Sequence, residues 1–125
     1  MAGKILIIED SEQDQKILER VFKKAGYQNL VFASSGEEGI EKATAETPDL
    51  IVLDLGLPRK SGPEVHNELK QHPRTRNIPV LFNTGLMKPG ESAGAGVNQS
   101  IVAKTPDAGD LLSKVREIMG GDGVK

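Results

Sequence analysis

Three short apolar runs constrain the fold of this 125-residue chain more than any other feature of its sequence. They are Ile5–Ile8, Leu50–Leu53 and Pro79–Phe82, and none of them alternates with polar residues. Continuous apolar runs of this length predict strands that are buried on both faces, as in a parallel sheet covered by helices. Two weaker runs, Leu30–Ala33 and Ile101–Ala103, predict two further strands.

Segments with helical spacing of apolar residues lie between these runs. Ile17–Ala25 and Leu111–Met119 carry apolar stripes that recur every three or four residues, as in helices packed on a sheet. The strands and helices therefore alternate, which predicts a doubly wound α/β fold with right-handed crossovers. One domain over residues 1–119 and a flexible tail over 120–125 account for the whole chain.

Local signals predict where several helices begin. Ser35 with Glu38, and Ser61 with Glu64, have the spacing of capping boxes. Thr105 is expected to cap the last helix, with Pro106 at its first position. One segment, Gly85–Ser100, contains Pro89 and several glycines, which disfavour a regular helix, so any fourth helix there is expected to be short or irregular.

Composition and charge exclude several classes of function. The chain has no cysteine, which excludes disulfides, thiol catalysis and cysteine-ligated zinc and fits the cytoplasm. Its net charge of −2 gives no general attraction to nucleic acid, and no apolar run approaches the roughly 20 residues that span a bilayer. The chain also lacks the glycine-rich loop of P-loop nucleotide-binding proteins.

Polar residues gather where the predicted strands end, and ligands of open parallel sheets bind at that edge. These residues are Glu9, Asp10, Asp54, Asn83, Thr84 and Lys104, of which Asn83 is interpreted as structural. Three carboxylates repel one another unless a cation lies among them, and Mg²⁺ is bound by one or two carboxylates together with phosphate oxygens. An aspartate can itself be the nucleophile of phosphoryl transfer. We therefore expect Asp54 to attack phosphorus while Mg²⁺ and Lys104 neutralise charge on the oxygens.

These motifs together resemble the receiver domains of two-component response regulators, over residues 4 to 119. The matching stretches are Ile7–Asp10, Pro48–Pro58 with Gly62, Pro79–Gly85 and Val102–Lys104. The resemblance implies a flavodoxin-like five-stranded parallel sheet of strand order 2-1-3-4-5.

The resemblance also implies the roles of individual residues. Asp54 would accept the phosphoryl group, Thr84 would be the switch hydroxyl, and Lys104 would contact the phosphate. Mg²⁺ would be held by Glu9, Asp10, Asp54 and the backbone carbonyl of Gly56. The donor would be a phosphohistidine on a sensor histidine kinase or phosphotransfer protein. The chain would act alone in the cytoplasm, as a monomer or weak dimer, through an unidentified downstream protein.

Three departures from the family pattern keep a second interpretation open. Ile101 stands where the family often has a switch aromatic, Thr105 replaces a common proline, and the glycine-rich segment replaces a helix. The alternative is a pseudo-receiver, with the same fold and phosphorylation-independent protein binding. A phosphatase of the haloacid-dehalogenase type would need a second aspartate two residues after Asp54, where this chain has Gly56.

Overall fold

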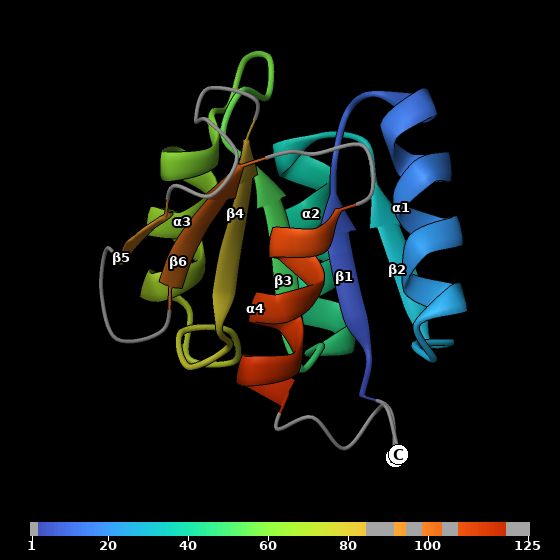
Figure 1. Cartoon of the computed structure of the whole chain (residues 1–125). Coiled ribbons are helices and arrows are strands. Elements are labelled where there is room, and N and C mark those ends of the chain that lie inside the picture. The colour runs from blue at the N-terminus through green and yellow to red at the C-terminus, as the bar shows by residue number, and fades with distance from the viewer. Residues whose placement is uncertain (1–2, 85–91, 95–98, 104–107, 120–125) are drawn as a thin grey trace.

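The computed structural model describes residues 3–84, 92–94, 99–103 and 108–119. Strands and helices alternate along most of the chain (Figure 1). In chain order they are β1 (Ile5–Ile8), α1 (Glu12–Lys24), β2 (Leu30–Ala33), α2 (Gly36–Glu46), β3 (Leu50–Asp54), α3 (Gly62–Gln71), β4 (Val80–Thr84), β5 (Ser92–Gly94), β6 (Gln99–Ala103) and α4 (Gly109–Met119).

The strands form one six-stranded sheet in the order β2-β1-β3-β4-β6-β5. All pairs are parallel except β5 with β6, which is antiparallel. The five predicted strands are β1, β2, β3, β4 and β6, so the expected order 2-1-3-4-5 is confirmed. The extra strand β5 lies in the segment for which a short or irregular helix was expected. Its three residues instead extend the sheet along the edge of β6, and the rest of that segment is outside the described residues.

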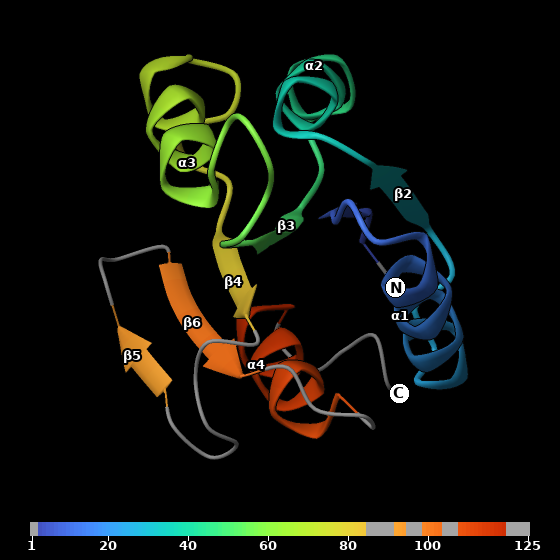
Figure 2. The ribbon, with the colours of Figure 1, turned by 90° about the horizontal axis from the view of Figure 1, so that it is seen from above.

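Helices cover the sheet on both faces (Figure 2). One core layer joins α1 and α4 to the sheet, and the other joins α2 and α3 to it. Along β1 the two layers take alternate residues, since Ile5 and Ile7 belong to the first and Leu6 and Ile8 to the second. This double burial explains why the strand runs do not alternate with polar residues. No helix in the described part of the chain has the length and apolar character needed to cross a membrane.

The predicted helix starts are confirmed in part. Ser61 and Glu64 form a complete capping box at α3. At α2 the Ser35 hydroxyl accepts from Glu38 N, but the Glu38 carboxylate accepts from Ser34 N instead of returning to Ser35. The capping box predicted for Ser35 and Glu38 is therefore only half formed, because the Glu38 carboxylate bonds to the residue before Ser35.

The predicted start of the last helix is wrong. Ala108 lies outside α4 with a left-handed φ of 55°, and the helix begins at Gly109. The carbonyl of Ala108 accepts from Leu112 N at 2.9 Å, a hydrogen bond of α-helical spacing. A helix that began at Pro106 could not run through the backbone turn at Ala108. Thr105 and Pro106 themselves lie outside the described residues.

The hydroxyl of Tyr27 is a buried polar atom without a hydrogen-bond partner among the described residues. The side chain is 0% exposed, and its ring meets Phe22 edge-on with centroids 6.0 Å apart. An unsatisfied buried hydroxyl costs about 1–3 kcal/mol, so Tyr27→Phe should raise the free energy of unfolding by about 1 kcal/mol. Urea denaturation measures this change. A loss of stability would show that the hydroxyl is hydrogen-bonded in solution.

Candidate functional site

Three carboxylates lie together at the carboxyl edge of the sheet. Strands β1 and β3 are parallel neighbours in which Ile8 pairs with Leu53, so the residues that come next, Glu9 and Asp54, lie side by side. Ligand oxygens of Glu9, Asp10 and Asp54 all lie within 4.8 Å of one another. Glu9 is 2% exposed, whereas Asp54 is half-buried and Asp10 is exposed. The predicted acidic cluster is therefore present, with one deep carboxylate and two that solvent can reach.

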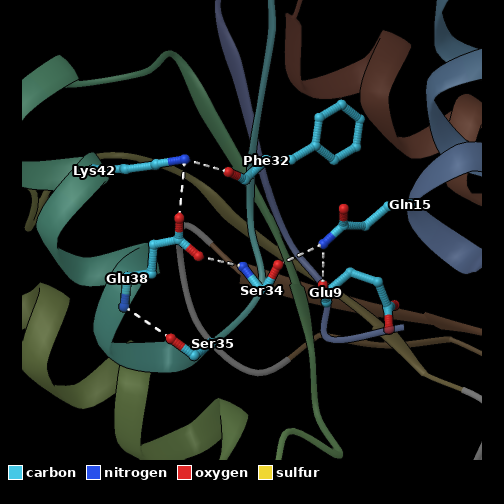
Figure 3. A network of polar contacts seen from close by, with 7 residues as sticks. All are labelled: Glu9, Gln15, Phe32, Ser34, Ser35, Glu38 and Lys42. Carbon is cyan, nitrogen blue, oxygen red and sulfur yellow. Dashed lines mark hydrogen bonds and ion pairs between the residues drawn. The ribbon is translucent and has the colours of Figure 1, made fainter. Parts of the chain in front are cut away.

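The buried Glu9 is held by backbone and side-chain hydrogen bonds. Its carboxylate accepts from Ser11 N at 3.1 Å, and its own backbone N donates to Ala33 O at 2.9 Å. Gln15 Nε2 donates to the carbonyl of Glu9 at 2.6 Å and to the hydroxyl of Ser34 at 3.2 Å (Figure 3). The loop after β1 is thus tied to the loop after β2, which fixes the main chain that carries two of the carboxylates.

A second set of contacts stabilises the loop after β2 (Figure 3). The Glu38 carboxylate accepts from Ser34 N at 2.7 Å and pairs with Lys42 at 3.2 Å. Lys42 also donates to the carbonyl of Phe32 at 2.6 Å. The hydrogen bond from Ser34, followed by the one from Lys42, holds the pKa of Glu38 below its ordinary value. Glu38 therefore remains charged at neutral pH and keeps Ser34 in place for Gln15.

The three carboxylates fit a hard divalent cation. They offer only oxygen ligands, at separations that a single ion can bridge, and their mutual repulsion would be relieved by positive charge. Exposed Asp10 and half-buried Asp54 also leave room for the water molecules that Mg²⁺ usually retains. This donor set suits Mg²⁺ better than zinc, which favours sulfur and nitrogen ligands.

Strand β3, which ends at Asp54, pairs with β1 on one side and with β4 on the other. Asp54 pairs in register with Asn83, and Thr84 is the last residue of β4 and is 1% exposed. Thr84 in turn pairs with Ala103, the last residue of β6. Thr84 therefore lies at the same sheet edge as Asp54. The sequence pattern predicted Thr84 just after the fourth strand, whereas it is the last residue of β4. Lys104, which follows Ala103, lies outside the described residues.

The loop after Asp54 contains Gly56, the other predicted metal ligand. Gly56 N donates to Asp54 Oδ1 at 3.2 Å, and the residue is exposed. This bond turns the loop back over the carboxylate. The contribution of Gln15 and Ser34 could not be predicted from the sequence, since neither belongs to a motif and their contact depends on how two loops meet.

Gly62 approaches the main chain of Asp54 so closely that no side chain fits. A Cβ atom added there would lie 2.8 Å from both Asp54 O and Leu55 Cα. Because backbone atoms cannot move aside cheaply, Gly62→Ala should lower the free energy of unfolding by about 1–3 kcal/mol. Chemical denaturation measures the loss. In the matched control Gly56→Ala the new Cβ meets nothing closer than 4.0 Å, so a change within about 0.5 kcal/mol is expected. Equal effects at the two glycines would contradict this explanation.

Known proteins resemble the chain in sequence and in fold. A family model described as the response regulator receiver domain matches residues 5–116. PhoP of Bacillus subtilis, named as the alkaline phosphatase synthesis transcriptional regulatory protein, is 44% identical over 84 residues, which are 67% of this chain and 34% of PhoP. The chain thus spans about a third of that relative. The polar-differentiation response regulator DivK of Brucella ovis is 29% identical over 96% of this chain and 98% of DivK.

A solved structure shares the fold. It is the receiver domain of the sensor histidine kinase PA1611 from Pseudomonas aeruginosa, with a magnesium ion coordinated in its active site cleft. The two structures align with a TM-score of 0.79 over 96% of this chain and 99% of that domain, at 22% identity. At 22% sequence identity this similarity shows a shared fold and nothing more.

Proposed function

The chain belongs to the response regulator receiver domain family, and on that premise we propose that Asp54 is the residue that accepts the phosphoryl group. Domains of this family are phosphoacceptors of two-component signalling. They are not conventional enzymes, they receive the phosphoryl group from a histidine kinase, and they bind Mg²⁺ in an acidic site. The observation that carries the assignment to Asp54 is its place in the carboxylate cluster, at the end of the central strand β3.

In the proposed reaction an oxygen of Asp54 attacks the phosphorus of a phosphohistidine. The new O–P bond forms as the P–N bond breaks, and the electron pair of that bond goes to the imidazole nitrogen of the donor. Asp54 suits this role because it is half-buried, so it is positioned by its neighbours and still accessible to a donor. Glu9 and Asp10, with the carbonyl of Gly56, would hold Mg²⁺ beside it.

Residues at neighbouring strand ends would bind the transferred group. The Thr84 hydroxyl would donate to one phosphoryl oxygen, and Lys104 would pair with another. Mg²⁺, when bound, neutralises charge on the phosphoryl oxygens. Glu9, the buried member of the cluster, is fixed by the hydrogen bond from Ser11 N to its carboxylate and would hold the cation next to Asp54.

The proposed output is binding of a downstream protein, by a monomer or weak dimer in the cytoplasm. The pseudo-receiver stays as the second candidate because β6 carries Ile101 at the position where the family often has an aromatic. We propose the phosphorylation-dependent function over this alternative, since a pseudo-receiver has no need of three carboxylates grouped within 4.8 Å.

Transfer from a phosphotransfer domain labelled on histidine tests the proposal. We expect the label to move to this chain in the presence of Mg²⁺ and to be located at Asp54 by borohydride reduction and peptide mass spectrometry. Label on another residue would overturn the assignment to Asp54. Absence of transfer, together with unchanged partner binding in Asp54→Asn, would favour the pseudo-receiver.

A further inference from the structure

We propose that Asn83 is a further phosphoryl-binding residue, whose side-chain N–H donates to an oxygen of the phosphoryl group on Asp54. This inference rests on the proposed function of Asp54 and adds a residue on β4 to the site.

Sheet register places Asn83 beside the phosphoacceptor. Asn83 pairs with Asp54 on β3 and with Val102 on β6. Register partners of neighbouring parallel strands project from the same face, and such strands lie about 4.8 Å apart. Val102 packs in the core layer of α1 and α4, so Asn83 and Asp54 also face that layer. Asn83 is 5% exposed, so its side chain is buried next to Asp54.

The amide of Asn83 is incompletely satisfied in the unphosphorylated protein. Its Oδ1 is buried without a hydrogen-bond partner among the described residues. A buried amide atom left unpaired costs about 1–3 kcal/mol, and an apolar residue of the same size would avoid that cost. A half-turn of the side-chain amide exchanges its oxygen and nitrogen, so the group can present N–H in the same place.

Phosphorylation of Asp54 supplies acceptors for the Asn83 N–H once the side-chain amide has made this half-turn. The phosphoryl group adds three strong acceptor oxygens, which need donors. Glu9 and Asp10 lie on the β1 side of Asp54, so a cation held by them would neutralise charge on that side. Asn83 lies on the opposite, β4 side, where its N–H can donate without competing for the metal. The amide thus complements the cation instead of duplicating it.

Asn83→Leu tests the inference, because leucine has a similar volume and no donor. Beryllofluoride, which binds aspartate as a phosphoryl mimic, serves as the probe in calorimetric titrations with saturating Mg²⁺. Loss of a hydrogen bond to a charged group should weaken beryllofluoride binding about tenfold. Mg²⁺ binding without beryllofluoride should stay unchanged, and the variant should be at least as stable as the wild type. The control Asn67→Leu alters an exposed asparagine on α3 and should match the wild type throughout.

A spectroscopic measurement separates phosphoryl binding from a purely structural role. In wild-type protein the side-chain NH₂ resonances of Asn83 should shift when beryllofluoride is added, and those of Asn67 should not. Equal beryllofluoride affinities of Asn83→Leu and wild type, or unmoved Asn83 resonances, would overturn the inference while the role of Asp54 stands. Wild-type protein that neither binds beryllofluoride nor accepts a phosphoryl group would instead overturn the proposed function, and this inference with it.

Discussion

Asp10→Asn is expected to weaken Mg²⁺ binding at least about tenfold and to slow phosphorylation of Asp54 in parallel. Removing an interaction that only supports a metal ligand already costs about 10–100-fold in affinity, so removing a ligand carboxylate should cost no less. Asp10 is exposed, so the fold does not depend on its burial. Isothermal titration calorimetry of the unphosphorylated protein with Mg²⁺ measures the affinity directly.

Asp49→Asn is the matched control for this experiment. Asp49 lies just before β3, at the opposite end of the strand from Asp54, and the substitution removes the same charge. Its carboxylate accepts from Lys4 N at 2.8 Å and takes no part in the acidic cluster. Mg²⁺ affinity should stay at the wild-type value. An equal loss of Mg²⁺ affinity in both variants would mean that the affinity depends on the net charge of the protein and not on the carboxylate cluster.

Phe22→Ala is expected to lower the free energy of unfolding by about 3–5 kcal/mol. Phe22 is 0% exposed on α1 and packs edge-on against Tyr27 in the core layer of α1 and α4. The substitution removes a large apolar surface and leaves a cavity that the surrounding strands cannot fill. Since domains of this size are stable by roughly 5–15 kcal/mol, much of the total would be lost. Guanidinium denaturation followed by circular dichroism measures it.

Phe32→Ala makes the same chemical change at a less buried place. Phe32 lies on the edge strand β2 and is half-buried at the margin of the same core layer. Because water already reaches this side chain, we expect a clearly smaller loss of stability than at Phe22. A loss at Phe32 that equals or exceeds that at Phe22 would contradict the division into core and margin.

The parallel sheet could be predicted from the sequence because its strands are buried on both faces. Ile5–Ile8 and Leu50–Leu53 read as continuous apolar runs for that reason, and their order along the chain fixed the crossovers. β5 could not be predicted, since its three small residues carry no apolar pattern and pair only because β6 offers an edge. The start of α4 was misjudged because a favourable Thr-Pro cap signal is local, whereas the turn at Ala108 depends on the surrounding fold.

The acidic cluster could be predicted because strand ends in a parallel sheet meet at one edge. Glu9 and Asp54 are 45 positions apart in sequence, yet each follows directly on the buried run of a neighbouring strand. The burial of the individual carboxylates could not be predicted from the sequence. Nothing in the sequence indicated that Glu9 is deep and Asp10 exposed, or that Gln15 would bridge two loops. The sequence indicated only a structural role for Asn83. Its buried, unpaired Oδ1 is found only when the packing around it is known.

The role of Asp54 as phosphoacceptor is tested most simply by the intact mass of the protein after incubation with phosphoramidate, with and without Mg²⁺. Wild type and Asp54→Asn are compared, since the amide preserves the size of the side chain and removes its nucleophilic carboxylate. The expected result is one phosphoryl adduct in wild type that requires Mg²⁺ and is missing in Asp54→Asn. No adduct in wild type under any condition, or an adduct that persists in Asp54→Asn, would contradict it.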